Sequence, residues 1–296
     1  MNGLLVVDKP GGMTSHDVVN RLRKITGEKS IGHLGTLDPM ATGVLPLLLG
    51  KFTRLAQYFS SAEKSYTGAI RFGFATDTYD AEGEAAGPDV WDEVGPALTL
   101  ERIQQAAARF HGEMDQLPPP FSAKKIQGTP AYKLAREGKP VELKTAKVRI
   151  ASLDVLALEG AEISFEMRVS AGGYVRSVAH ELGQDLGCGA HLSKLRRTQA
   201  GCFVIEQART LEELQAAAGD AETLEALCVH PRALLPEMPA VMADTHSISR
   251  MRNGAQANLP EFSDASLVKV FVGQRDLVAI AKRIAGTLFQ PVVVMG

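Results

Sequence analysis

The chain has 296 residues, 45% of them hydrophobic and 22% charged, which is typical of globular proteins and argues against disorder or a fibrous repeat. No apolar stretch approaches the roughly 20 residues needed to cross a bilayer, and no basic segment precedes the short apolar run near the N-terminus, so we expect a cytoplasmic protein with no membrane partner. The net charge of −2 gives no overall basic footprint for nucleic acid.

The N-terminal segment predicts a strand followed by a helix. Residues 3–8 (GLLVVD) form an apolar run that the turn residues 9–12 end. Thr14 or Ser15 can cap the helix that follows, and Gly27 can end it. The apolar residues of this segment recur at helical spacing and are Val18, Val19, Leu22 and Ile25.

Residues 31–50 are interrupted by glycine and proline without a clear period. They therefore predict a long loop that leads into a buried apolar element. Beyond this segment, the elements follow from the spacing of apolar side chains. Strands are expected over residues 64–74, 148–158 and 163–169, and helices over 100–110 and 174–186.

Positive charge gathers in one segment of the chain. Between Phe121 and Ile150, eight Lys and Arg residues stand against only Glu137 and Glu142. This local excess predicts a surface that faces phosphates.

The last part of the chain has a different pattern. Prolines 231, 236 and 239 mark a linker near residue 236. Three β-rich runs follow, LVKVFVG, DLVAIAKRI and LFQPVVVM, and they favour a small barrel or sandwich.

The most unusual stretch runs from Gly32 to Pro46 (GHLGTLDPMATGVLP). Its glycines allow the backbone to approach another group closely, and Pro39 favours an extended conformation at Asp38. A carboxylate therefore stands at the end of a rigid turn. On spacing alone, an Asp-Pro pair is more often a turn than a catalytic site.

This stretch resembles the signature of the bacterial tRNA pseudouridine-55 synthase family, a loop of the form GHxGTLDPxATGVLP that carries the catalytic aspartate. The resemblance keeps its order and spacing over about the first two-thirds of the chain. Its other parts are Lys9-Pro10, Thr14-Ser15-His16-Asp17, Lys64-Ser65-Tyr66, Thr76-Asp77-Thr78, Asp80, Gly83, Pro119-Pro120-Phe121-Ser122, Gly173-Tyr174-Val175-Arg176-Ser177, Gly187-Cys188-Gly189-Ala190-His191 and Leu195-Arg196-Arg197-Thr198.

The resemblance implies a catalytic role for three residues. Asp38 would attack or deprotonate the target nucleoside, so that uracil detaches from the ribose, turns, and rejoins through C5, without a cofactor. Tyr66 would stack on the target base and take part in proton transfer, and Arg176 would pair with the catalytic carboxylate and keep it ionised. Spacing alone favours a core aromatic at Tyr66 over a catalytic residue, and it is compatible with a solvated helix arginine at Arg176.

The resemblance also implies residues that bind the RNA substrate. His33 matches a residue that the family inserts into the RNA loop to help displace the flipped nucleotide. Tyr174 and Leu195 match residues that line the base pocket, although either is equally compatible with ordinary packing.

Three cations complete the expected substrate-binding set. Lys9, with the adjacent Pro10, is expected to support the architecture of the active site. Lys125 and Arg136 come from the basic segment and are candidate phosphate contacts, which are independent of base sequence.

The spacing of the cysteines and histidines does not favour a metal site. Cys188, His191, Cys202, Cys228 and His230 could be assembled into zinc ligands, but the spacing lacks a second tight pair. We therefore expect neither a metal nor a small-molecule cofactor.

The expected fold is α+β, with a pseudouridine synthase catalytic domain over residues 1–236 that has a mixed, largely antiparallel sheet and flanking helices. A small β-rich module over residues 237–296 resembles a PUA-type RNA-binding domain. The expected reaction converts uridine 55 in the T-loop of tRNA to pseudouridine, by a monomer. Two alternatives stay open: a non-catalytic tRNA-binding or tRNA-folding module, and a nucleoside hydrolase, which needs a second carboxylate beside Asp38.

Overall fold

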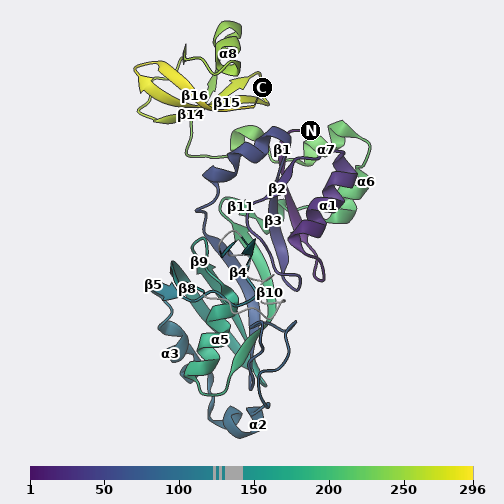
Figure 1. The fold of residues 1–296 in the computed structure, drawn as a ribbon, viewed down its shortest axis with the longest axis vertical. Helices are drawn as coiled ribbons and strands as arrows, with labels where there is room; N and C mark the ends of the chain where they lie inside the picture. Colours follow the sequence, from purple (N-terminus) through teal and green to yellow (C-terminus); the bar gives the residue numbers. More distant parts are fainter. Residues whose placement is uncertain (123–124, 127–128, 131–142, 296) are drawn as a thin grey trace.

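The computed structural model of the chain describes residues 1–122, 125–126, 129–130 and 143–295. Its larger part is built on a mixed sheet of nine described strands, which are antiparallel except that β3 and β10 run parallel (Figure 1). In spatial order the strands are β1 (Gly3–Lys9), β3 (Thr42–Leu49), β10 (Ala190–Ala200), β4 (Lys64–Phe72), β9 (Glu162–Val169), β8 (Ala146–Glu159) and β5 (Gly112–Gln116), with β2 (Ile31–His33) beside β3 and β11 (Phe203–Val204) beside β10.

Helices pack along this sheet in two groups. Helix α1 contacts β2 and α6, and α6 contacts β1, whereas α3 lies on β8 and α5 on β10 (Figure 1). The helices and short 3-10 segments of this part are α1 (Ser15–Thr26), η1 (Gly50–Tyr58), α2 (Trp91–Val94), η2 (Gly95–Ala97), α3 (Leu100–Ala108), α5 (Val175–Asp185), η3 (Ile205–Gln207), α6 (Leu211–Ala216), α7 (Ala221–Leu227) and η4 (Pro231–Ala233). No helix in the described part of the chain is long and apolar enough to span a membrane.

The first helix forms as its sequence predicts. Thr14 caps α1 in a reciprocal capping box with Asp17, and Gly27 ends the helix with a left-handed φ of 68°. The four apolar residues at helical spacing are all buried on the face that packs into the core. The expected strands over residues 64–74, 148–158 and 163–169 and the expected helices are also present, with bounds that differ by a few residues.

Residues 31–50 do not form the long loop that their glycines and prolines predicted. β2 and β3 occupy both ends of this segment, and only residues 34–41 lie between them. β3 is buried on both faces, so its apolar residues run continuously and show no strand period. Pro46 has no N–H to donate, but its carbonyl accepts a hydrogen bond from the Leu34 N–H at 2.9 Å.

Strand β10 was not predicted, although it lies near the middle of the sheet. Its sequence, AHLSKLRRTQA, carries four charged or ionisable residues and lacks a clean alternation of apolar and polar side chains. The strand forms because neighbouring strands pair with it and bury Arg197, whose side chain is hydrogen bonded to nearby carbonyls.

The C-terminal part forms a second sheet of five described strands. The three β-rich runs predicted there are confirmed as β14, β15 and β16. The sheet also holds one parallel pair, between β12 and β14. Its elements are β12 (Ala240–Met242), β14 (Leu267–Val272), β15 (Asp276–Ala285), β16 (Leu288–Val294), β13 (Ala257–Asn258) and helix α8 (Thr245–Arg252). A separate ribbon, β6 (Lys125–Ile126) with β7 (Thr129–Pro130), lies in the basic segment.

The two sheets share a hydrophobic cluster. Leu4 and Val44, on one face of β1 and β3, are buried together with Phe271 and Leu277 of the C-terminal sheet. The opposite face of β1 and β3 belongs to the large core under α1. Lys269 on β14 also connects the C-terminal sheet to the linker, because its buried ammonium donates to the carbonyls of Arg232 at 2.8 Å and Leu234 at 2.6 Å.

Replacing Gly43 with alanine should destabilise the fold severely. Gly43 has a φ of 99°, and an added Cβ would overlap the carbonyl oxygen of Arg197 where β3 runs beside β10. The matched control is Gly160→Ala, which has a φ of 56° and no atom within 4 Å of the added Cβ, so it should cost only the roughly 1–2 kcal/mol of a left-handed residue. Thermal unfolding of both variants measures the difference, and equal melting temperatures would contradict the close approach of β3 and β10.

Candidate active site

The Asp38 loop, defined as residues 34–41, has no helix or strand of its own. Arg197 on β10 is only 1% exposed and supports the first half of the loop. Arg197 Nη2 donates to the Gly35 carbonyl at 3.0 Å and Nη1 to the Thr36 carbonyl at 3.4 Å, while Nε donates to Val44 at 2.7 Å. One buried arginine therefore fixes the loop to the sheet.

The middle of the loop is held by the first helix. The buried hydroxyl of Ser15, the first residue of α1, accepts from the Leu37 N–H at 2.8 Å and donates to the Leu37 carbonyl at 3.1 Å. The peptide group on each side of Leu37 is thereby satisfied without secondary structure. This reciprocal pair fixes the backbone immediately before Asp38.

Lys9, at the end of β1, lies under the loop. Its side chain is 0% exposed, and its ammonium donates to the carbonyls of Pro39 at 3.1 Å, Met13 at 2.6 Å and Pro10 at 2.9 Å. Burial lowers the pKa of Lys9 to about 8. All three ammonium protons are used on backbone, so the contacts of Lys9 are with the loop and its surroundings.

Asp38 forms an ion pair with Arg176 on α5. Arg176 Nη2 donates to Asp38 Oδ1 at 3.1 Å, and Nε lies 3.0 Å from Oδ2 without its N–H being aimed at that oxygen. The Asp38 side chain is 31% exposed although protein atoms surround it, whereas the Arg176 side chain is 6% exposed. Burial raises the pKa of Asp38, and the Arg176 guanidinium opposes this rise.

Arg176 is itself held by two other segments. Nη1 donates to the Thr78 carbonyl at 3.0 Å and lies 3.4 Å from Asp80 Oδ2, and Nη2 also donates to the Phe121 carbonyl at 2.9 Å. Because a guanidinium is planar, these contacts fix the direction in which it faces Asp38.

Asp80 is a functional residue to which the sequence assigned no role. It is 3% exposed, and its Oδ1 accepts from the Thr78 hydroxyl at 2.6 Å and the Glu82 N–H at 3.1 Å. Its charge also contributes to the raised pKa of Asp38. With both oxygens in use and little solvent access, Asp80 is poorly placed to activate a water for hydrolysis. The only signal for Asp80 in the sequence was its position two residues after the Thr76-Asp77-Thr78 motif.

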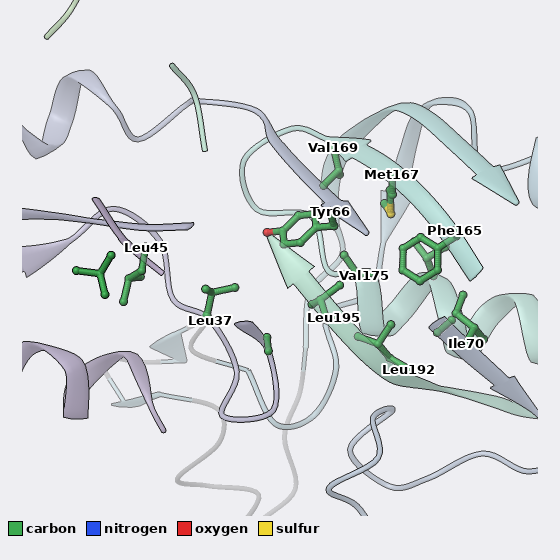
Figure 2. Close-up of a cluster of buried hydrophobic side chains, with 14 of the residues drawn as sticks. Leu37, Leu45, Tyr66, Ile70, Phe165, Met167, Val169, Val175, Leu192 and Leu195 are labelled. Atoms are coloured by element: carbon green, nitrogen blue, oxygen red, sulfur yellow. The ribbon is translucent and has the colours of Figure 1, made fainter. Parts of the chain in front are cut away.

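The floor of the site is an apolar sheet face. Tyr66 on β4 pairs directly with Arg197, and Leu195 lies two residues before Arg197 on the same face of β10. Figure 2 shows Tyr66 among Val169, Val175 and Leu195, with its hydroxyl directed away from Phe165 and Ile70, toward the side on which Leu37 lies. Among the described residues, this hydroxyl has no hydrogen-bond partner.

Tyr174 is placed by Gln116, a residue that sequence reasoning missed. The buried Gln116 amide accepts from the Tyr174 N–H at 2.7 Å and donates to its carbonyl at 3.0 Å, which fixes the backbone just before α5. Burial raises the pKa of the Tyr174 phenol, so it stays protonated. Tyr174 precedes Arg176 by two residues, which brings it to the same end of α5.

His33 ends β2 at the start of the Asp38 loop. Burial, together with the nearby charge of Arg197, lowers the pKa of its imidazole, so the ring is neutral at neutral pH. Its Nδ1 is buried and has no partner among the described residues.

The two remaining predicted residues come from the basic segment. Lys125 belongs to β6, and Arg136 lies outside the described residues. Within the described ranges, no three His, Cys, Asp or Glu side chains are grouped so as to hold a metal ion, and the three cysteines are free.

The structure thus brings together a partly accessible carboxylate, a buried arginine that pairs with it, and an apolar floor that carries a phenol. A carboxylate in such a place can act as a nucleophile or a base on a substrate that excludes water. Every group that defines this arrangement lies within one chain.

Two family models match adjacent segments of the chain. Residues 23–175 match the family model of the TruB family pseudouridylate synthase N-terminal domain, and residues 176–236 match that of the tRNA pseudouridylate synthase B C-terminal domain. Asp38, Tyr66 and Tyr174 fall in the first match and Arg176 in the second.

Relatives are similar over nearly their whole length. The tRNA pseudouridine synthase B of Solibacter usitatus is 45% identical over 298 residues, covering 100% of both chains. That of an Arthrobacter strain is 42% identical and covers 99% of this chain and 96% of its own.

Two solved structures have the same overall fold. An H/ACA RNP bound to a substrate RNA containing 2′-deoxyuridine matches with a TM-score of 0.69 and 25% identity, over 99% of this chain and 85% of the other. A Cbf5-Nop10-Gar1 complex matches with a TM-score of 0.67 and 28% identity, over 96% and 79%. Together with the family matches and the full-length relatives, these findings show that the chain belongs to the TruB family of pseudouridylate synthases.

Proposed function

We propose that the chain isomerises uridine to pseudouridine at position 55 in the T-loop of tRNA, with Asp38 as the catalytic carboxylate. The observation that carries this proposal is the Asp38–Arg176 pair, presented by a braced loop beside the Tyr66 face of the sheet. The names of the full-length relatives support tRNA as the substrate. The resemblance of residues 32–46 to the family signature supports the T-loop position.

The reaction rearranges one nucleoside without a second reactant. The N1–C1′ bond breaks, uracil turns within the site, and a C5–C1′ bond forms. The proton on C5 is then lost and N1 gains a proton, so substrate and product have the same composition. Asp38 assists by attack or by proton removal, and a water-poor site retains the free base until it rejoins.

Arg176 and Tyr66 have separate roles in the proposed reaction. Arg176 keeps Asp38 ionised against the effect of burial and holds its carboxylate in one orientation. Tyr66 offers a ring for stacking and a hydroxyl that has no partner among the described residues, which suits proton transfer from C5.

The other predicted residues are proposed to bind the RNA or to support the site. His33, at the edge of the Asp38 loop, contacts the RNA beside the flipped nucleotide, while Tyr174 and Leu195 line the base pocket. Lys9 serves the substrate indirectly, because its ammonium is fully engaged by backbone carbonyls beneath the loop. Lys125 and Arg136 remain proposed phosphate contacts.

We also propose that the catalytic domain spans residues 1–236 and that residues 237–296 form a separate β-rich module. The proposed boundary is supported by the separate five-stranded sheet and by the end of the second family match at residue 236. We further propose that the chain acts as a monomer.

Two other functions fit the site less well. A module that only binds or folds tRNA has no use for a carboxylate paired with a buried arginine. A nucleoside hydrolase needs a second carboxylate to activate water, and Asp80, which shares Arg176 with Asp38, is buried with both oxygens engaged.

Asp38→Asn should lower turnover by at least about 1,000-fold, since the amide can neither attack nor remove a proton. Affinity for tRNA should stay within a few-fold, and the melting temperature should not fall, because burial disfavours the Asp38 charge. Release of tritium from tRNA labelled at C5 of uridine measures turnover. A transcript with cytidine at position 55 is the substrate control. Full activity of Asp38→Asn would reject the mechanism, and release from the cytidine transcript would reject the position.

Tyr66→Phe should lower kcat roughly 100-fold while leaving tRNA binding nearly unchanged, because the ring is kept and only the hydroxyl is lost. The measurement is single-turnover tritium release together with filter binding of the same tRNA. Tyr58→Phe removes a phenolic hydroxyl outside the site and serves as the matched control. Equal rates for the Tyr66→Phe variant and the original chain would exclude the proton-transfer role.

Arg176→Lys should shift the acidic limb of the pH profile to higher pH. Asp38 must be ionised to act, burial raises its pKa, and Arg176 opposes that rise, so a weaker partner leaves the pKa higher. The defect should be largest at low pH and shrink as pH increases through the range of about pH 5 to 9 in which kcat/KM is measured. Arg196→Lys is the control, because Arg196 pairs with Asp8 away from Asp38. An unshifted acidic limb in Arg176→Lys would contradict this role.

A further inference from the structure

Tyr79 has a backbone conformation that large side chains rarely adopt. Its φ is 66°, and in the described part of the chain Leu235 is the only other residue besides glycine with a positive φ. This conformation costs free energy because the Cβ crowds the following carbonyl. It persists only where surrounding contacts compensate for the strain.

The compensating contact is a stack with His180. The two rings are nearly parallel, at an interplanar angle of 9°, and their centroids lie 3.7 Å apart. His180 is on α5, one helical turn after Arg176, so both side chains lie on the same face of that helix. The ring contact therefore joins the strained turn to the helix that carries the catalytic arginine.

The residues on either side of Tyr79 both contact Arg176. The Thr78 carbonyl accepts from Nη1 at 3.0 Å, and Asp80 Oδ2 lies 3.4 Å from the same nitrogen. The left-handed turn at Tyr79 brings these two groups to one side of the chain. A change of Tyr79 to a negative φ would rotate the Thr78 carbonyl away from the guanidinium.

The turn is also anchored to the sheet on its other side. The Leu192 N–H donates to the Tyr79 carbonyl at 3.0 Å, and the Ala81 N–H donates to the Leu192 carbonyl at 3.0 Å. The Thr76 hydroxyl donates to the Asp80 carbonyl at 2.7 Å. These bonds hold the ends of the turn, and the ring stack holds its centre.

We propose that the Tyr79–His180 stack is a positioning device for the catalytic guanidinium. It keeps the strained turn in the conformation in which Thr78 and Asp80 fix Arg176 Nη1, and it thereby keeps the opposite edge of Arg176 on Asp38. Tyr79 and His180 are positioning residues that act through Arg176, and this inference rests on the proposed role of the Asp38–Arg176 pair.

The test compares variants that remove the stack with variants that keep it. Tyr79→Ala and His180→Ala should each lower kcat roughly 10- to 100-fold, with the KM for tRNA within about twofold, because the substrate contacts are untouched. Tyr79→Phe and His180→Phe keep two stacked rings and should stay within about threefold of the original kcat. Glycine adopts the left-handed conformation without strain, so Tyr79→Gly should lose less activity than Tyr79→Ala.

Two readouts separate positioning from a merely structural role. A looser Arg176 lowers the pKa of Asp38 less, so the acidic limb of kcat/KM should move to higher pH in Tyr79→Ala and His180→Ala. The charged groups that face Asp38 are Arg176, Asp80, Lys9 and Glu82, and none of them is altered. The double variant Tyr79→Ala/His180→Ala should be no slower than the slower single variant, because each change removes the same contact.

The result that overturns the proposal is an original kcat and pH profile in Tyr79→Ala, or equal losses in the phenylalanine and alanine variants. Additive losses in the double variant would overturn it as well. Tritium release by the original chain is measured in parallel. If the original chain releases no tritium, the proposed function fails; if it does and the stack variants match it, only the positioning role fails.

Discussion

The site depends on a segment that cannot hold its own shape. The Asp38 loop forms no strand or helix of its own, and unpaired buried peptide groups cost free energy. Three buried side chains supply the missing partners: Arg197 from β10, Ser15 from α1 and Lys9 from β1. Because each comes from a different element of the core, the carboxylate of Asp38 takes its position from the fold as a whole. A rearrangement of any one of these elements therefore reaches the catalytic group.

The charged cluster of Asp38, Arg176 and Asp80 fixes the geometry of the site and contributes little to stability. Asp38 and Asp80 share Arg176 in a place where burial disfavours every one of these charges, and buried ion pairs return little net free energy. The stability that offsets them comes from the neighbouring strands. β1 and β3 are buried on both faces, with the large core on one side and the cluster shared with the C-terminal sheet on the other. The site is therefore attached to the most deeply buried strands of the protein.

Local patterns in the sequence located most elements but not all. Helical spacing and a capping residue were sufficient to predict α1. The strands β3 and β10 were not predicted, because β3 is apolar on both faces and β10 carries charged side chains into the interior. For the site, the family resemblance indicated the Asp38–Arg176 pair. Of the side chains that hold the loop it indicated only Lys9, because the other contacts join residues as far apart as 22 positions for Ser15 and 162 for Arg197. Such partners become visible only once the chain is folded.

The charges beneath the loop have a consequence for the chemistry. Arg197 and Lys9 are bonded mainly to carbonyl oxygens, so their positive charge is not neutralised as it would be in an ion pair. The charge of Arg197 contributes to lowering the pKa values of His33 and Lys64. In the proposed reaction the electron pair of the glycosidic bond departs with uracil, and fixed cations close to the loop favour that separation. The side chains that give the loop its shape thus also supply an electrostatic environment that suits the bond being broken.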